Sequence, residues 1–150
     1  MIKIISFVDT FKHYNEPILE FQKRLWASVE FVKLKPSKKK NISEIVLEES
    51  LELKKVLAKF KWYKVLLYID WKTRDSLDFA KFIEDKQEKF SNLVFVVWWA
   101  YWVDFEKIAD FIDEKFSFWP MTFPHSQAIL MLYEQIYRAQ MIKKWSSYHH

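Results

Sequence analysis

This chain of 150 residues contains no glycine and eight tryptophans. At an ordinary usage of about 7%, a chain of this length carries roughly ten glycines. Glycine is the usual residue in turns that require a positive φ, because it has no Cβ to clash. The tryptophans stand where such turns are expected, since most of them follow a strand-like or helix-like run. They are Trp26, Trp62, Trp71, Trp98, Trp99, Trp102, Trp119 and Trp145.

Replacing each tryptophan by glycine gives ordinary loop sequences. The segment around Trp71 becomes D-G-K-T, and residues 96–104 become V-V-G-G-A-Y-G-V-D. We therefore interpret the tryptophans as UGA codons translated as Trp, from a gene whose host reads UGA as glycine. The alternative is genuine enrichment in tryptophan. The distinction matters because Trp98, Trp99 and Trp102 crowd a single loop.

Composition predicts one globular domain spanning residues 1–150. Hydrophobic residues make up 51% of the chain, which excludes a disordered protein and predicts a sizeable core. The absence of cysteine excludes disulfides, thiolate metal sites and a cysteine nucleophile, and no other metal site is expected. The net charge of +4 is compatible with an RNA partner without requiring one.

No segment is expected to enter a membrane. The apolar N-terminus is too short for a signal sequence and is followed closely by Asp9. The longest apolar run, residues 94–103, is also too short to span a bilayer. A cytoplasmic location is therefore expected.

Strand-like and helix-like segments alternate along the chain, which predicts an α/β fold with a parallel-rich sheet covered by helices on both faces. Strands are predicted at Ile2–Phe7, Val29–Leu34, Val65–Ile69 and Leu93–Val97, with a short extended piece at Met121–Phe123. Helices are predicted at Glu16–Leu25, from Asn41 or Ser43 to Phe60, and at Asp75–Phe90, Asp104–Phe116 and His125–Lys143. Glu48, Glu49 and Glu52 are expected on an exposed helix face.

Three glycine-type turns follow strand-like segments, at residues 68–72, 97–104 and 117–125. Open α/β sheets bind ligands at the carboxyl ends of their strands. With glycine restored, none of these turns matches a phosphate-binding loop. A ligand crevice and plain turns both fit this pattern.

Three C-terminal motifs are more specific. They are Met121–His125 (MTFPH), Tyr133–Ala139 (YEQIYRA) and the terminal pair Tyr148 and His149. Together they resemble the SPOUT methyltransferases, and in particular the RlmH family of ribosomal large-subunit pseudouridine N3-methyltransferases. The resemblance covers the whole chain, and the tryptophans fall on positions that are commonly glycine in that family. Two positions depart from the family pattern: Ile129, where arginine is common, and Val8, where glycine is common.

The resemblance implies a C-terminal trefoil knot, an obligate homodimer, and S-adenosylmethionine bound in the knot. The family's cofactor contacts correspond to Ile69, Trp98, Phe118, Trp119, Pro120, Met121, Thr122 and Phe123. The dimer is expected to pair through the last helix, where Leu130, Leu132, Tyr133 and Ile136 offer apolar surface.

The implied reaction is methyl transfer to N3 of a pseudouridine in helix 69 of 23S rRNA, on the large subunit or the 70S ribosome. His149, or a water that it holds, is a candidate proton acceptor. Arg138 is a candidate contact to rRNA phosphates, in a site completed by the second subunit.

Several of the candidate residues also have a purely structural interpretation. Arg138 lies four residues after Glu134, so an ion pair within one helix is equally consistent. His125 is compatible with helix capping as well as catalysis, and Lys38–Lys40 with a solvated loop as well as phosphate binding.

A function from another class remains open. If the tryptophans are genuine, Trp98, Trp99 and Trp102 fill the cofactor crevice. The chain is then better interpreted as a knotted RNA-binding or ribosome-assembly protein without methyl transfer.

Overall fold

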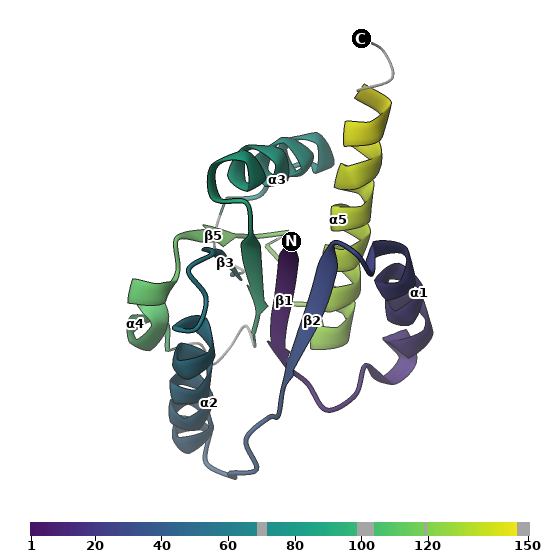
Figure 1. Cartoon of the computed structure of the whole chain (residues 1–150). Coiled ribbons are helices and arrows are strands. Elements are labelled where there is room, and N and C mark those ends of the chain that lie inside the picture. Colours follow the sequence, from purple (N-terminus) through teal and green to yellow (C-terminus); the bar gives the residue numbers. More distant parts are fainter. Residues whose placement is uncertain (69–71, 99–103, 119, 147–150) are drawn as a thin grey trace.

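The protein is built on one sheet of five parallel strands in the order β2-β1-β4-β3-β5. The computed structural model describes residues 1–68, 72–98, 104–118 and 120–146. The strands are β1 (Ile2–Phe7), β2 (Val29–Leu34), β3 (Tyr63–Leu67), β4 (Leu93–Val97) and β5 (Glu114–Phe116). Because every neighbouring pair is parallel, the amino ends of the strands lie at one edge of the sheet and the carboxyl ends at the other (Figure 1).

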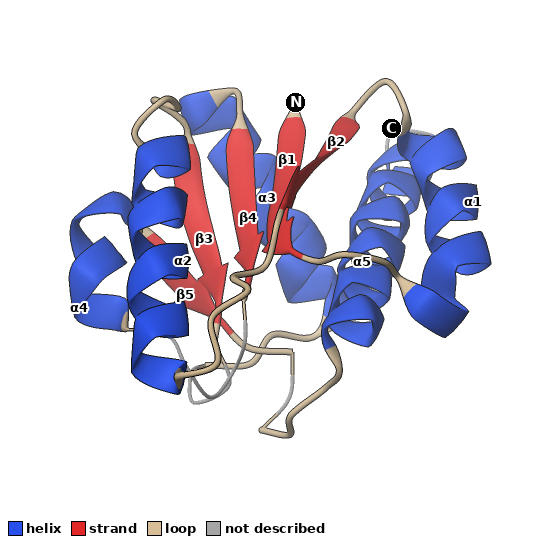
Figure 2. Cartoon of the chain, turned by 90° about the horizontal axis from the view of Figure 1, so that it is seen from below, coloured by secondary structure: helices blue, strands red, loops and turns tan. Residues whose placement is uncertain are grey.

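Helices cover both faces of this sheet, as predicted (Figure 2). One face carries α1 (Asn15–Leu25), α3 (Ser76–Phe90) and α5 (His125–Ser146), and the other carries α2 (Ile42–Leu57) and α4 (Phe105–Ile108). Short 3₁₀ turns, η1 (Lys12–Tyr14) and η2 (Ala109–Phe111), precede α1 and follow α4. Asn41 caps α2, because its side chain accepts hydrogen bonds from the Ser43 and Glu44 amides, and Asp75 caps α3 in the same way.

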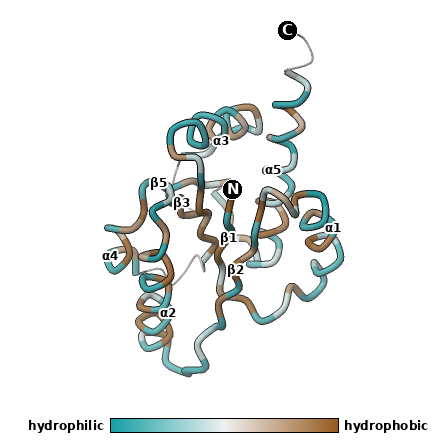
Figure 3. The backbone as a smooth tube through the Cα atoms, viewed as in Figure 1, coloured by the Kyte–Doolittle hydropathy of each residue, from teal (hydrophilic) through white to brown (hydrophobic). Residues whose placement is uncertain are grey.

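Strand β4 explains how one sheet divides the core into two halves. All five of its residues are buried, as expected for a central parallel strand. Leu93, Phe95 and Val97 face α1, α3 and α5, whereas Val94 and Val96 face α2 and α4. The hydrophobic segments therefore concentrate along the central strands, and the hydrophilic ones lie mainly on the outer helices (Figure 3).

The helix predicted over Asp104–Phe116 is wrong in its second half. Helix α4 ends at Ile108, and residues Glu114–Phe116 form the edge strand β5 instead. Pairing with β3 decides the outcome, because the Asp113 amide donates to the Lys64 carbonyl at 2.9 Å and Phe116 becomes buried. Tertiary contacts of this kind override local helix propensity. Asp104 precedes α4 but its side chain makes no capping bond, and Met121–Phe123 forms no strand.

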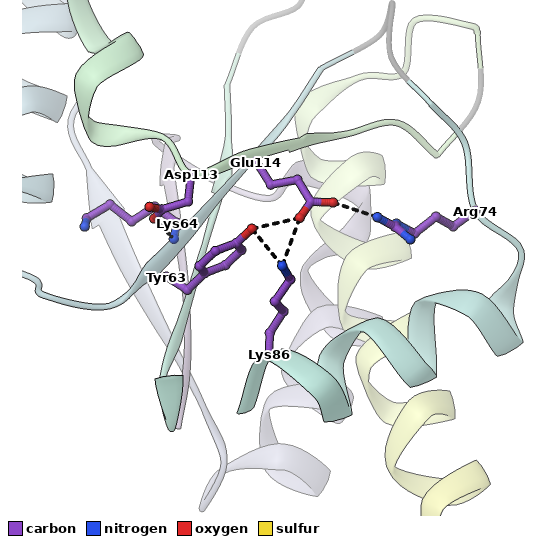
Figure 4. A network of polar contacts seen from close by, with 6 residues as sticks. All are labelled: Tyr63, Lys64, Arg74, Lys86, Asp113 and Glu114. Carbon is purple, nitrogen blue, oxygen red and sulfur yellow. Dashed lines mark hydrogen bonds and ion pairs between the residues drawn. The ribbon is translucent and has the colours of Figure 1, made fainter. Parts of the chain in front are cut away.

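Strand β5 is fixed at its start by a charged network around Glu114 (Figure 4). The Glu114 carboxylate accepts hydrogen bonds from the Tyr63 hydroxyl at 2.8 Å and the Arg74 guanidinium at 2.6 Å, and it forms an ion pair with Lys86 at 3.3 Å. Burial alone would raise the pKa of Glu114, but the hydrogen bonds and the Lys86 charge outweigh it and lower that pKa. The network therefore holds β5 to β3, to α3 and to the segment after β3.

The tryptophans that the structure describes do not occupy left-handed turns, contrary to the sequence-based expectation. Trp26 directly follows α1 in a right-handed conformation (φ −49°), and Trp145 lies within α5. Among the described residues, positive φ occurs at Lys12 (48°) and Ser91 (62°). Trp71, Trp99, Trp102 and Trp119 lie outside the described residues. The trefoil knot stays a prediction, since residues 69–71, 99–103 and 119 are not described.

Candidate functional site

The carboxyl ends of β3, β4 and β5 meet at one edge of the sheet. In the strand register, Leu67 pairs with both Val97 and Phe116, so these three strands end at the same level. The segments after β3 and β5 also touch, since the Ser117 amide donates to the Lys72 carbonyl at 3.3 Å. The carboxyl ends of these strands lie at the bottom of Figure 2. This is the position at which open α/β sheets bind ligands.

The structure brings the segment predicted to contact the cofactor to this edge. Phe118 packs edge-on against Phe116, with ring centroids 5.2 Å apart, and Phe123 is partly buried. Pro120, Met121 and Thr122 are exposed, with 60% of Met121 accessible. Apolar walls with few charges suit a ring and a thioether, so these residues fit a nucleoside-type methyl donor. Ile69, Trp119 and His149 lie outside the described residues.

Trp98 immediately follows β4 and is buried at this same edge. Its indole turns toward the α2 face and packs on the Phe7 ring, with centroids 5.7 Å apart. The indole Nε1–H donates to Oε2 of Glu49 at 3.0 Å. A side chain at position 98 therefore occupies space between β1, β4 and α2, and glycine there would leave that space open.

Glu49, the residue that accepts the Trp98 hydrogen bond, is buried within α2. The prediction that it lies on an exposed face is wrong, because only 4% of it is accessible. Its two carboxylate oxygens accept from the Ser37 amide at 3.0 Å and from Trp98. Helical spacing could have found it, since Glu49 lies four residues before the buried Leu53 and shares its stripe.

An open groove lies beside Glu49, between α2 and the segment that follows β2. We call it the lysine groove; its volume is about 850 Å³. It is lined by the carboxyl ends of β1 and β2, by the lysine-rich segment and by α2: Phe7, Lys33, Leu34, Lys35, Pro36, Ser37, Lys38, Lys39, Glu48, Glu49, Leu51, Glu52 and Lys55.

His125 is the first residue of α5 and is mostly buried. Burial lowers its pKa to about 4, and a hydrogen bond with the backbone of Phe7 only partly opposes this effect. The imidazole is therefore neutral at neutral pH, and its low basicity makes it a weak proton acceptor. This favours the structural interpretation of His125, which joins α5 to the end of β1.

Arg138 is not brought to the cofactor segment within one chain. Its Nε donates to Glu134 Oε1 at 2.9 Å on the exposed side of α5, which is the ion pair within one helix that the spacing allowed. Arg138 lies about 20 Å along the helix from His125, at a rise of about 1.5 Å per residue. The C-terminal end of α5 points away from the carboxyl edge (Figure 1). Arg138 can therefore reach such a site only in a second subunit.

The apolar residues of α5 expected to form a dimer interface are largely used within the chain. Leu132, Tyr133 and Ile136 are fully buried in the core against α1, α3 and the sheet, and Leu130 is partly buried. The Tyr133 hydroxyl accepts from Gln22 Nε2 at 3.1 Å, and burial raises the pKa of Tyr133 to about 12. Ile129, where the family commonly has arginine, is also fully buried.

The described residues contain no group of three or more acidic or histidine side chains that could hold a metal ion. Within the same part of the chain, no helix is long and apolar enough to cross a membrane.

Comparison with known proteins identifies relatives along the whole chain. A family model described as "Predicted SPOUT methyltransferase" matches residues 1–149. A protein of Caldicellulosiruptor saccharolyticus is 31% identical, and the match covers 99% of both chains. Proteins of Fusobacterium nucleatum and Clostridioides difficile are each 33% identical, with 92% of this chain and 91% of theirs covered. All three are named ribosomal RNA large subunit methyltransferase H.

The sheet has the parallel α/β arrangement expected from the alternation of strand-like and helix-like segments, and Phe118 follows β5 at the carboxyl edge of the sheet. Because the family model spans nearly the whole chain and the relatives align over more than nine tenths of it, this chain belongs to the SPOUT methyltransferase family.

Proposed function

We propose that residues 1–150 act as one SPOUT domain that methylates RNA of the large ribosomal subunit, with S-adenosylmethionine as the methyl donor. One observation carries this proposal: relatives named for that activity align with 92% to 99% of the chain. The carboxyl ends of β3, β4 and β5, which lie at one level at the edge where open α/β sheets bind ligands, support it. The finer target, N3 of a pseudouridine in helix 69 of 23S rRNA, rests on the resemblance of the C-terminal motifs.

The residues that would hold the methyl donor are those after β4 and β5. Phe118 and Phe123 provide partly buried apolar walls, and Pro120, Met121 and Thr122 present an accessible surface. The donor supplies an activated methyl group on a positively charged sulfur. The protein's own contribution is to align the attacking ring nitrogen and to exclude water, and alignment alone can supply most of the acceleration.

The ring N3 must also lose its proton. We assign this proton to His149 or to a water that His149 holds. The pKa of about 4 at His125 argues against that residue in the same role.

A two-fold dimer completes the proposal, since Arg138 lies far from the edge of its own subunit. Leu132, Tyr133 and Ile136 are buried inside the chain, so the pairing surface on α5 must use other residues of that helix. A cytoplasmic location, where ribosomes are found, accords with this function.

The alternative of a knotted RNA-binding protein without methyl transfer is favoured by one observation. The Trp98 indole is integrated into the core, through its contact with Phe7 and its hydrogen bond to Glu49. These are the contacts of an ordinary buried tryptophan, so they favour a genuine tryptophan at position 98. The alternative is the better interpretation if the tryptophans are genuine.

Nucleoside mass spectrometry of rRNA tests the finer target. The gene is deleted from its host, and 23S rRNA is compared with that of the complemented strain. We expect a methylated pseudouridine in helix 69 that disappears with the gene and returns with it. An unchanged set of methylated nucleosides would contradict a methyltransferase function and favour the alternative.

A further inference from the structure

We propose that the lysine groove binds the phosphate backbone of the RNA substrate and leads it past Trp98 at the end of β4. This inference rests on the proposed function and deepens it, by naming the surface that holds the substrate. Five lysines and three glutamates line the groove.

The lysines are available to a ligand, whereas most of the glutamates are engaged. Within the described part of the chain, Lys35, Lys38, Lys39 and Lys55 form no ion pair. All four are exposed.

Two of the three glutamates in the groove already accept hydrogen bonds. Both oxygens of Glu49 are used by Ser37 and Trp98, and Glu48 accepts from the Ser37 hydroxyl. Among the described residues only Glu52 lines the groove as a carboxylate without such a bond. With five lysines and three glutamates, the lining keeps a formal net charge of +2, and its exposed lysines are not paired with these carboxylates.

The lining favours phosphate over bases as the bound group. Phe7 is the aromatic residue in the groove, and only 2% of it is accessible. Base recognition on single strands normally uses exposed aromatic rings for stacking. Lysines contact phosphate as point charges and carry no sequence information. The groove should therefore bind RNA with little sequence preference and with a strong dependence on salt.

The position of the groove connects it to the candidate methylation site. Phe7 lines the groove and its ring also packs on Trp98, which follows β4. Glu49 lines the groove and accepts the Trp98 indole hydrogen bond. An RNA strand held by the lysines thus passes close to Trp98, the first residue after β4.

Salt-dependent RNA binding by two matched variants tests the proposal. The groove variant carries Lys35→Gln, Lys38→Gln and Lys39→Gln. The control variant carries Lys23→Gln, Lys61→Gln and Lys89→Gln, which are exposed lysines outside the groove, so its net charge changes equally. The probe is a short fluorescein-labelled RNA hairpin, and Kd is measured by anisotropy at several salt concentrations.

We expect the groove variant to bind at least tenfold more weakly than the parent, and the control variant to stay within about threefold of it. The slope of log Kd against log salt concentration should fall by about 2 for the groove variant, since each phosphate contact contributes about 0.7–0.9. Equal weakening of both variants would overturn the proposal, because net charge alone would then explain binding. Tighter binding of the parent to phosphatidylserine vesicles than to RNA, lost in the groove variant, would overturn it in favour of a membrane surface.

A second measurement separates this proposal from the proposed function. Methyl transfer to 70S ribosomes is followed with glycine at the eight tryptophan positions in all three proteins: the parent and both lysine variants. A raised KM with unchanged kcat for the groove variant alone supports the groove. Transfer by the groove variant with the parent's KM contradicts the groove and leaves the methyltransferase function standing. If the parent transfers no methyl group yet the salt slopes differ as expected, the groove stands and the proposed reaction fails.

Discussion

The Trp98 indole donates a hydrogen bond of 3.0 Å to a buried carboxylate oxygen of Glu49. The pair joins the end of β4 to the middle of α2, and the second Glu49 oxygen continues the connection to the Ser37 amide. A buried carboxylate needs such donors, because leaving one of its oxygens unpaired costs about 1–3 kcal/mol or more. The identity of residue 98 therefore determines the packing between β1, β4 and α2 at this edge.

Trp98→Gly should lower stability and increase cofactor affinity together. Removing the indole opens a cavity against Phe7 and removes a donor from Glu49, so we expect a loss of about 3–5 kcal/mol in the free energy of unfolding without cofactor. The family resemblance puts position 98 among the cofactor contacts. The same change should therefore strengthen S-adenosylmethionine binding at least tenfold, which corresponds to about 1.4 kcal/mol. Urea unfolding and calorimetry measure the two effects.

Trp26→Gly is the matched control, since Trp26 is 81% accessible and lies just after α1, outside the cofactor segment. It should change neither quantity by a comparable amount. Unchanged cofactor affinity in Trp98→Gly would mean that the indole does not restrict the site.

Glu114→Gln should weaken the attachment of β5. The carboxylate holds Tyr63, Arg74 and Lys86 together, and a neutral amide loses the charge that both cations share. We expect a loss of about 1–3 kcal/mol in the free energy of unfolding, as is typical for hydrogen bonds to a charged group. Glu30→Gln, which breaks the more exposed Lys3–Glu30 pair, should cost less than about 1 kcal/mol. Equal losses in urea titrations of the two variants would refute a special role for the Glu114 network.

His125 should make stability depend on pH. The unfolded chain binds a proton on this residue below about pH 6.5, whereas the folded chain binds it only below about pH 4. Between these values the unfolded state holds more protons, so the free energy of unfolding falls as pH falls, by on the order of 3 kcal/mol in total. His125→Gln should remove most of this dependence in urea titrations at about pH 7 and about pH 4.5. His13→Gln, at an exposed position, should retain it, and a His125→Gln variant with the parent's full pH dependence would contradict the assignment.

The positions of α1, α2, α3 and α5 and of four strands followed from sequence periodicity, because each carries an apolar stripe or run that fits one face of a layered fold. Strand β5 did not, since Glu114–Phe116 is three residues long and its pairing with β3 depends on contacts between residues about fifty positions apart. The burial of Glu49 was not predicted, because charged side chains such as glutamate usually lie on the exposed face of a helix. The helical spacing of the α2 stripe was the better guide.

The candidate site was predicted from motifs rather than from periodicity. The segment Pro120–Phe123 lies at the expected edge. However, no local sequence pattern could reveal that the Trp98 indole turns toward α2. Nor could it reveal that three apolar residues of α5 are buried in the core of their own chain: Leu132, Tyr133 and Ile136. Both outcomes depend on which helix packs on which face of the sheet. The left-handed turns expected at the tryptophans were also absent at the described positions, where right-handed or helical conformations serve instead.

The codon interpretation predicts the gene sequence directly. All eight tryptophan codons should be UGA, and mass spectrometry of the protein from its native host should show glycine at these positions. Among the described tryptophans, Trp98 is the position at which replacing tryptophan by glycine changes the packing most, because its indole is buried against Phe7. UGG codons at Trp98, Trp99 and Trp102 would contradict the interpretation and favour the RNA-binding alternative.

Methyl transfer in a purified system tests the rRNA methyltransferase function directly. The chain with glycine at the eight positions is incubated with S-adenosylmethionine carrying a tritiated methyl group and with 70S ribosomes from a strain lacking the gene. We expect label to enter 23S rRNA, with at least tenfold less transfer by the chain containing the eight tryptophans. Absence of label in 23S rRNA with the glycine version, under conditions where it is folded and binds RNA, would contradict the assignment as an rRNA methyltransferase.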